Sequence, residues 1–257
     1  MPLVDLARIS KTYPNGVEAL SALELAVGTG EFLTLIGPSG CGKSTALRLI
    51  AGLEAPGAGA VSWPDGRPKL GYVFQEPTLM PWASVFDNIW LPLRLEGQSR
   101  RQAGPAVEDA LTLVGLSDFA RARPGELSGG MKMRVSIARA LVTRPGLLLM
   151  DEPFAALDEI TRFRLNDELL GLKARLGFTV VFVTHSIFEA VYLSSRIVVM
   201  TPRPGRIAGE FVISETVRDD AFRTSVSYAG YARRVSDCLR DASGESRVDT
   251  GPIRVHS

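Results

Sequence analysis

The chain has 257 residues, of which 46% are hydrophobic and 22% charged, a composition ordinary for a globular protein with a substantial core. Its 29 basic and 28 acidic residues leave a net charge of +1, so no global field points to a nucleic-acid partner or an acidic membrane surface. Two cysteines argue against a disulfide framework and favour a reducing compartment, and we find neither a signal peptide nor a membrane-spanning run of about 18 apolar residues.

Apolar patterns along the chain predict an α/β fold. Residues 13–16, Tyr-Pro-Asn-Gly, indicate a turn, and the alternation of Leu23, Leu25 and Val27 with other residues predicts a half-buried antiparallel strand. Short apolar runs of the kind found in covered parallel strands lie at Phe32–Ile36, Leu147–Met150, Val180–Val183 and Ile197–Met200. Helical patterns at residues 45–53 and 131–142 lie between them, which favours a central parallel sheet.

Two regions differ from this pattern. Residues 76–127 are rich in proline at first and then helical, so we expect a helical subdomain, over about 76–145, inserted into a domain that spans 1–215. Residues 216–257 form a predicted C-terminal extension. In it, Tyr228, Tyr231, Val235 and Leu239 follow helical spacing, and the last dozen residues are expected to be frayed.

A glycine-rich segment between a predicted strand and helix matches the pattern G-x-x-x-x-G-K-[ST]. The segment is Gly37-Pro38-Ser39-Gly40-Cys41-Gly42-Lys43-Ser44-Thr45. Glycines allow backbone N–H groups to converge on phosphate oxygens, Lys43 would reach the β- and γ-phosphates, and the Ser44 hydroxyl would bind Mg²⁺. A chance glycine-rich turn is the alternative, and the flanking strand and helix argue against it.

Polar side chains also follow three apolar strands. Asp151 and Glu152 follow the apolar run that begins at Leu147. Asp151 is the predicted Mg²⁺ ligand, and Glu152 is the predicted base that polarises the attacking water. His185 follows another strand and would contact the γ-phosphate or that water. Gln75 follows Gly71–Phe74 and would bind Mg²⁺ or water. An acidic helix cap, a structural histidine and an exposed glutamine are the alternative interpretations.

A second candidate anion site lies at Leu127-Ser128-Gly129-Gly130-Met131, at the start of a predicted helix. A single chain that binds one nucleotide does not need two phosphate-binding helix N-termini. Two chains do need them if each lends its second end to the other's ATP. A plain serine N-cap is the alternative.

With these motifs in order, the chain resembles the ATP-binding subunits of ABC transporters over about residues 3–215. The resemblance implies a P-loop NTPase core with a mostly parallel sheet, an N-terminal antiparallel β subdomain and the inserted helical subdomain. It also implies ATP and Mg²⁺ as cofactors, adenine stacking by Tyr13 and a D-loop at Ala156-Leu157-Asp158 that contributes Asp158 to the nucleotide site. The signature has Met131, and Met133 follows, at positions where the family commonly has glutamine.

The family resemblance further implies a head-to-tail homodimer with two ATP molecules between the subunits. Segments 75–82, 157–162 and 203–207 look like those of nitrate, sulfonate and taurine importers, a subfamily that includes importers of pyrimidine-type vitamin precursors. We therefore expect transmembrane permease subunits and, indirectly, an extracytoplasmic solute-binding protein as partners. The chain would lie peripherally on the cytoplasmic face of the inner membrane. Trp82 would face the permease or pack within the helical subdomain.

Three other functions remain open at this point. A non-transport ABC ATPase acting on DNA or the ribosome would carry a coiled-coil insert or a second cassette with basic linkers, and neither is evident. A regulatory GTPase would need Asn-Lys-x-Asp, but no lysine follows Asn15, Asn88 or Asn166. An ATP-binding scaffold without turnover would not need Glu152 and His185.

Overall fold

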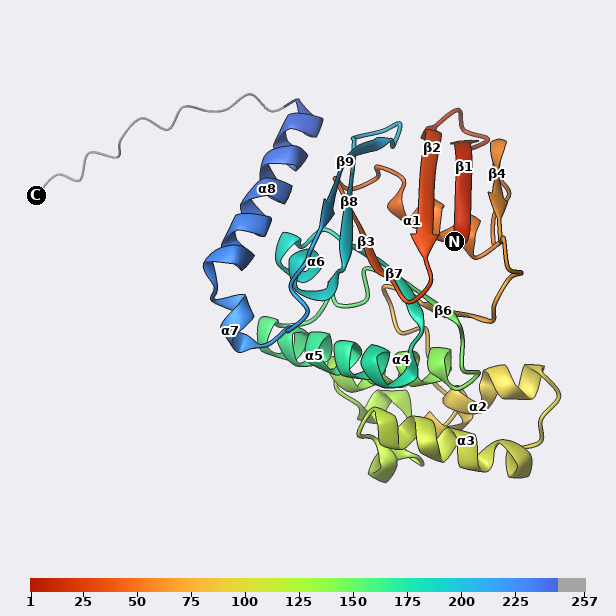
Figure 1. The fold of residues 1–257 in the computed structure, drawn as a ribbon. Coiled ribbons are helices and arrows are strands. Elements are labelled where there is room, and N and C mark those ends of the chain that lie inside the picture. Colours follow the sequence, from red (N-terminus) through yellow and green to blue (C-terminus); the bar gives the residue numbers. More distant parts are fainter. Residues whose placement is uncertain (245–257) are drawn as a thin grey trace, which may run out of the picture.

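The computed structural model describes residues 1–244 (Figure 1), and the frayed end expected over the last dozen residues lies outside this range. The strands are β1 (Pro2–Thr12), β2 (Glu18–Gly28), β3 (Phe32–Ile36), β4 (Ala58–Ser62), β5 (Leu70–Val73), β6 (Leu147–Asp151), β7 (Thr179–Thr184), β8 (Arg196–Met200) and β9 (Ile207–Val212). The helices are α1 (Lys43–Ile50), α2 (Val85–Leu95), α3 (Arg100–Leu113), α4 (Gly129–Leu141), α5 (Glu159–Leu176), α6 (Ile187–Leu193), α7 (Asp220–Arg223) and α8 (Val226–Ser243), with short 3₁₀ turns at Ser117–Phe119 and Pro124–Glu126.

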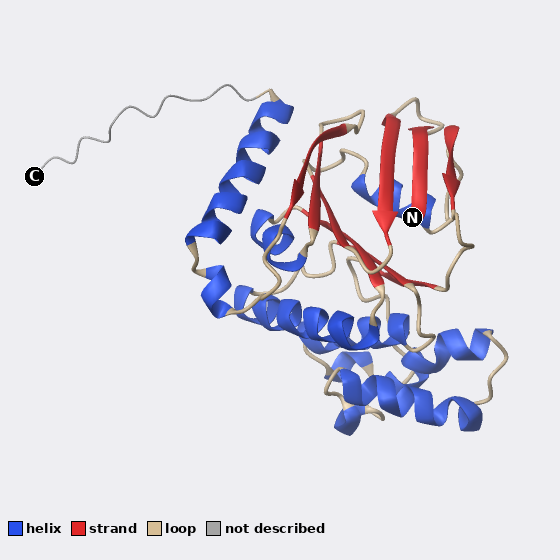
Figure 2. Ribbon diagram, viewed as in Figure 1, coloured by secondary structure: helices blue, strands red, loops and turns tan. Residues whose placement is uncertain are grey.

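A three-stranded antiparallel sheet of order β2-β1-β4 forms the N-terminal part of the fold (Figure 2). Leu23, Leu25 and Val27 of β2 are buried, and Leu25 pairs with Leu6 of β1. The alternation in the sequence therefore reports a real core face, and the predicted antiparallel strand is confirmed.

The second sheet has six strands in the order β5-β6-β7-β3-β8-β9, and only the edge strand β9 runs antiparallel to its neighbour. Every residue of β3, β6 and β7 is buried, as expected for parallel strands covered on both faces. The ends of these strands meet at one edge of the sheet, because Ile36 lies opposite Thr184 and Asp151 lies opposite Val183. The predicted mostly parallel sheet is confirmed.

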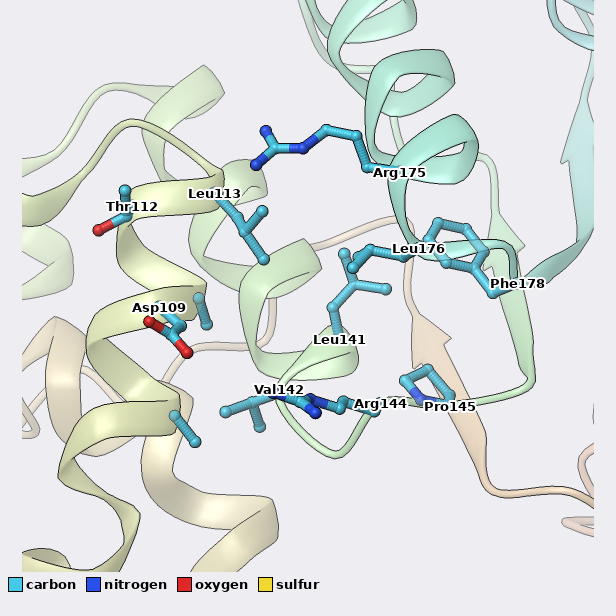
Figure 3. A pocket seen from close by; sticks show the side chains of 12 residues that line it. Asp109, Thr112, Leu113, Leu141, Val142, Arg144, Pro145, Arg175, Leu176 and Phe178 are labelled. Atoms are coloured by element: carbon cyan, nitrogen blue, oxygen red, sulfur yellow. The ribbon is translucent and has the colours of Figure 1, made fainter.

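The segment between β5 and β6 is helical, with α2, α3 and α4 arranged below the sheets in Figure 1. It has a core of its own around Ile89, Val107 and Leu111. A cavity of about 550 Å³ separates α3 from the C-terminal ends of α4 and α5, with Leu113, Leu141 and other side chains on its walls (Figure 3). The bounds of the inserted helical subdomain, 76–145, and the boundary between domain and C-terminal extension, at 215/216, remain predictions.

The C-terminal extension packs against the second sheet (Figure 1). In α8, Tyr228, Tyr231 and Val235 are buried, and the Tyr231 hydroxyl lies 2.9 Å from Ser214 Oγ. The predicted amphipathic helix is therefore confirmed. Over residues 1–244, no helix combines the length and apolar character that crossing a bilayer requires.

Candidate functional site

The glycine-rich segment forms a tight loop between β3 and α1. Gly42 has φ +103°, and a Cβ there would lie 2.6 Å from Leu20 Cδ2, so both the backbone conformation and the space require glycine. Gly40 also has a positive φ of +76°. The loop can curl because these two positions carry no side chain, and it leads directly into the first turn of α1.

Lys43 and Cys41 point into the loop. Lys43 is 4% exposed, and its Nζ donates to the carbonyls of Gly37 at 2.8 Å and Pro38 at 3.0 Å. The loop thus places the Lys43 ammonium beside the N-terminus of α1. Both the ammonium and the helix N-terminus attract an anion. Burial raises the pKa of the Cys41 thiol, partly offset by the neighbouring lysine, so the thiol stays neutral.

Ser44 and Asp151 meet although they are far apart in the sequence. The Ser44 hydroxyl donates to Asp151 Oδ1 at 2.7 Å, and the Tyr72 hydroxyl donates to Asp151 Oδ2 at 3.4 Å. Burial and the Asp151 carboxylate together raise the pKa of Tyr72, so the phenol remains a donor. Hydroxyl and carboxylate oxygens are the donors that Mg²⁺ prefers, and the pair therefore fits the predicted metal.

Glu152 and His185 form the other pair at this edge of the sheet. The Glu152 Oε2 atom lies 3.2 Å from His185 Nδ1. Glu152 has φ +47°, a left-handed conformation that costs a non-glycine residue about 1–3 kcal/mol, and its N–H donates to Val183 O at 2.9 Å. The fold therefore holds the backbone of Glu152 in an unfavourable conformation and places its carboxylate beside His185.

A cavity of about 550 Å³ is lined by nine of the nineteen predicted site residues, and Asp151 and His185 are not among them. Its walls comprise Tyr13, Asn15, Val17, Ala19, Ser39, Gly40, Gly42, Lys43, Ser44, Thr45, Gln75, Glu152 and Arg203. The Tyr13 hydroxyl lies 3.1 Å from Thr45 Oγ1, and the Lys11 ammonium lies 5.6 Å from the centre of the Tyr13 ring. An aromatic wall, a cationic loop and a carboxylate thus surround one space large enough for a small ligand.

Five residues of this site were not predicted from the sequence: Asn15, Val17, Ala19, Arg203 and Tyr72. Arg203 lines the cavity and donates from Nε to Gly40 O at 3.1 Å, and Tyr72 contacts Asp151. Tyr72 lies opposite Leu149 in the β5–β6 register, two residues before Asp151. Only the strand order, which a single sequence does not reveal, would have brought that tyrosine to the site.

Ser128, Gly129, Gly130 and Met131 lie outside the cavity, at the N-terminus of α4. Ser128 Oγ accepts from Met131 N–H at 3.3 Å and so acts as an N-cap. As the first two helical residues, Gly129 and Gly130 have N–H groups without an intrahelical acceptor. A Cβ on Gly129 would lie 3.5 Å from Leu157 Cδ2, so this helix end adjoins the residue before Asp158.

Asp158 also lies outside the cavity, at the start of α5. It is an exposed N-cap whose Oδ1 accepts from Thr161 N–H at 2.9 Å. This hydrogen bond holds the pKa of Asp158 below its ordinary value. Asp158 and the N-terminus of α4 at Gly129–Gly130 therefore lie near each other on a surface outside the nucleotide cavity.

The site can bind an anionic ligand at the loop, hold a divalent cation at Ser44 and Asp151, and orient or deprotonate a water at Glu152. These are the parts that phosphoryl transfer to water requires.

Comparison with known proteins agrees with this chemistry. A model of the ABC transporter family matches residues 20–155. The chain is 46% identical over 244 residues to an uncharacterized ABC transporter ATP-binding protein of Methanocaldococcus jannaschii, an alignment covering 92% of this chain and 90% of that protein. It is 47% identical over 255 residues to the spermidine/putrescine import ATP-binding protein PotA of Salmonella typhimurium, covering 96% of this chain and 67% of that protein.

Among solved structures, the chain is similar to an ATP-binding cassette crystallised as a dimer in a post-hydrolysis state with ADP and Pi. The TM-score is 0.73 at 33% sequence identity, and the match covers 82% of this chain and 99% of that one.

Proposed function

The chain belongs to the ABC transporter family and is an ATPase of that family, and on this premise we propose that it powers a solute importer through a separate membrane permease. One observation carries the proposal. The phosphate loop, the Ser44–Asp151 pair and the Glu152–His185 pair converge at a single edge of the sheet. Both pairs join residues from distant parts of the sequence, so the fold is needed to assemble them.

In the proposed mechanism, the loop amides and Lys43 bind the β- and γ-phosphates of ATP. Lys43 exchanges its bonds to two carbonyls for bonds to phosphate oxygens, which are stronger because both partners are charged. Tyr13 stacks on the adenine. Ser44, Asp151 and Gln75 would hold Mg²⁺, which when bound would neutralise phosphate charge.

Hydrolysis is assigned to Glu152 and His185. Glu152 accepts a proton from, or orients, the water that attacks the γ-phosphate, and His185, whose Nδ1 contacts Glu152 Oε2, positions the carboxylate. Because the Glu152 carboxylate already lies beside His185 before substrate arrives, little reorganisation is needed at the moment of reaction.

A second copy of the chain completes the site in this proposal. Gly129 and Gly130, whose amides lack an intrahelical acceptor, do not line their own chain's cavity, but in this proposal the same surface on a partner covers it, together with Asp158. The similar cassette that was solved as a dimer supports this arrangement. ATP then holds two subunits together, and loss of phosphate releases them.

The permease and the location follow from the same proposal. An importer ATPase without a spanning helix in its described part would dock on the cytoplasmic face of permease subunits, which receive solute from an extracytoplasmic binding protein. Trp82 is 74% exposed and lies in the loop before α2, within the helical segment, which makes it available to a permease. A variant Trp82→Ala should keep ATP hydrolysis and lose co-purification with the permease.

The transported solute is the finer part of the proposal. Segments 75–82 and 203–207 favour the nitrate, sulfonate and taurine class, with a pyrimidine-type vitamin precursor as the alternative. The 47% identity to a spermidine/putrescine import protein makes polyamines a second candidate class.

Turnover and solute require separate experiments. Phosphate release by the purified chain with ATP and Mg²⁺ tests the ATPase, and a chain that binds ATP without turnover would instead be a scaffold. Disruption of the chain in its host, followed by uptake assays with sulfonates, nitrate, taurine, pyrimidine precursors and polyamines, tests the solute. Uptake of one class should fall, and unchanged uptake of all of them would favour a function outside transport.

A further inference from the structure

The turn at residues 201–206, which follows β8, packs directly against the phosphate loop. A Cβ on Gly205 would collide with the carbonyl oxygen of Cys41, so the backbones of the turn and the loop touch. Arg203 Nε donates to Gly40 O at 3.1 Å. A Cβ on Gly40 would lie 2.7 Å from Arg203 Nη2, so the guanidinium lies against that glycine. The turn and the loop therefore meet at two points, and each of them requires a glycine.

Hydrogen bonds to β2 hold the same turn in place. Gly205 N–H donates to Ala19 O at 2.9 Å, and Gly205 O accepts from Ser21 N–H at 3.2 Å. The side chain of Arg203 is exposed, but the backbone that carries it is fixed between β2 and the phosphate loop. The position of its guanidinium is therefore set by the fold as well as by the bond to Gly40.

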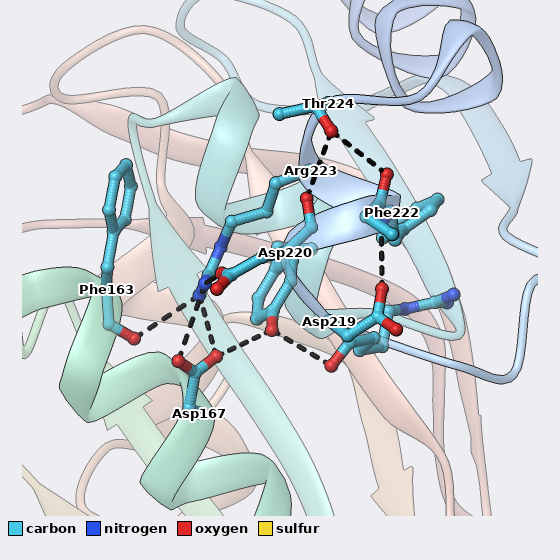
Figure 4. A network of polar contacts seen from close by, with 10 residues as sticks. Phe163, Asp167, Asp219, Asp220, Phe222, Arg223 and Thr224 are labelled. Carbon is cyan, nitrogen blue, oxygen red and sulfur yellow. Dashed lines mark hydrogen bonds and ion pairs between the residues drawn. The ribbon is translucent and has the colours of Figure 1, made fainter.

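The positive charge of Arg203 has no acidic partner within residues 1–244. Arg223, by comparison, donates to Asp167 at 2.7 Å and to Asp220 at 2.9 Å (Figure 4). The bond from Nε to Gly40 O is the single hydrogen bond that Arg203 makes to this part of the chain. A guanidinium has five N–H donors, so the Nη1 and Nη2 groups remain available to an anion.

Arg203 is one of two cationic side chains on the wall of the nucleotide cavity. Lys43 is the other, and Glu152 is the single anionic side chain among the lining residues. The sheet order places β8, which leads to Arg203, on one side of β3, and β6, which leads to Glu152, beyond β7 on the other side (Figure 1). Because the phosphate loop follows β3, Arg203 and Glu152 lie on opposite sides of that loop.

We propose that Arg203 binds the α- and β-phosphates of the nucleotide. Its Nη groups donate to phosphate oxygens while Nε keeps its bond to Gly40 O, and guanidinium donors match phosphate oxygens in charge and in geometry. The γ-phosphate lies near Glu152, across the loop, and is not the partner of Arg203. This assignment rests on the proposed function, which places ATP in the cavity.

Calorimetry with ATP and with ADP, in EDTA to prevent turnover, tests the assignment. Arg203→Gln should weaken the binding of both nucleotides by the same factor, about tenfold or more, because hydrogen bonds to charged groups are lost. Arg203→Lys keeps the charge and should lose less affinity. Unchanged affinity in Arg203→Gln, or a loss confined to ATP, would overturn the proposal.

Arg206→Gln is the matched control. Arg206 belongs to the same turn, its Nη2 donates to Ser21 Oγ at 3.1 Å, and it does not line the cavity. The control should bind both nucleotides as tightly as the unaltered chain. An equal loss of affinity in Arg206→Gln and Arg203→Gln would show a general effect of removing charge from the turn and would also overturn the proposal.

Ionic strength separates phosphate binding from mere support of the loop. Attraction between charges is screened by salt, so the difference in affinity between the unaltered chain and Arg203→Gln should shrink as the salt concentration rises from about 0.05 M to about 0.5 M. A difference that stays constant would mean that Arg203 acts only by holding the Gly40 carbonyl, which contradicts the assignment.

A crystal structure of the unaltered chain with ADP provides a test that needs no variant. A guanidinium nitrogen of Arg203 should lie within hydrogen-bond distance of an α- or β-phosphate oxygen, and a guanidinium that contacts only Gly40 O would refute the assignment. Lys43→Ala distinguishes this failure from failure of the proposed function. If the unaltered chain binds neither nucleotide, the nucleotide site itself is refuted. If it binds both and only Lys43→Ala weakens binding, the role of Arg203 alone is refuted.

Discussion

The substitution Glu152→Gln tests the assignment of the catalytic base. Glutamine has the shape of glutamate but accepts no proton, and its amide can still contact His185 Nδ1 across the present 3.2 Å. The loop that binds phosphate is untouched. The variant should therefore keep its fold and its affinity for ATP while its chemistry is lost.

The expected loss follows from the role of the group. A positioned general base contributes about 10²–10⁴-fold to a rate, so turnover should fall by about this factor, equivalent to about 2.7–5.4 kcal/mol in activation free energy. Glutamate and glutamine at position 152 experience the same backbone strain at φ +47°, so the strain does not change the expected loss of turnover.

The assay compares phosphate release with nucleotide affinity in the same preparations. Glu108→Gln, an exposed acid on α3, is the control and should match the unaltered chain. Turnover of Glu152→Gln within threefold of the unaltered chain would refute the assignment, and so would a loss of ATP binding equal to the loss of turnover.

Three further predictions concern the loop and the C-terminal helix. Lys43→Ala removes a charged donor and should weaken ATP binding about ten- to a hundredfold by calorimetry; unchanged affinity would refute the loop assignment. Gly42→Ala places a Cβ 2.6 Å from Leu20 Cδ2 and should lower the free energy of unfolding by about 1–3 kcal/mol in urea, whereas Gly171→Ala, with open space in α5, should raise it slightly. Equal effects of the two glycine substitutions would contradict this reasoning. Burial raises the pKa of Tyr228 to about 12, and the unfolded phenol ionises first. The free energy of unfolding should thus fall by up to about 2.7 kcal/mol as pH rises from about 10 to 12, and less in Tyr228→Phe; equal slopes would contradict the assignment.

The strands could be predicted where burial on both faces leaves a continuous apolar run. The structure places β3 at Phe32–Ile36, as the sequence predicted, because all five residues are buried. By contrast, β4 is almost entirely exposed and β9 alternates between exposed and half-buried residues. Neither produces an apolar run, so neither strand was predicted.

Helix ends were less predictable than strands. The apolar pattern placed a helix at residues 45–53, but α1 spans Lys43–Ile50. Lys43 and Ser44 are polar and belong to the helix because the glycine loop feeds directly into it. The helix ends early because Gly52 adopts φ +66°, a conformation that helices cannot continue through.

The site could be predicted wherever one segment carries the chemistry, as in the phosphate loop and the Asp151–Glu152 strand end. Contacts between segments could not. Tyr72 reaches Asp151 through the β5–β6 register, and Arg203 reaches Gly40 across the fold. The cavity of about 480 Å³ between α5, α6, α7 and α8 could not be predicted either, because its lining residues Asn166, Glu189 and Tyr228 come from three different helices.

In the proposed mechanism, two copies of this chain share each ATP. A crystal structure of Glu152→Gln with ATP and Mg²⁺ tests it most directly. The expected structure is a dimer in which each γ-phosphate contacts Lys43 of one copy and the Gly129 and Gly130 amides of the other. A single copy with ATP at its loop and those amides facing solvent would contradict it.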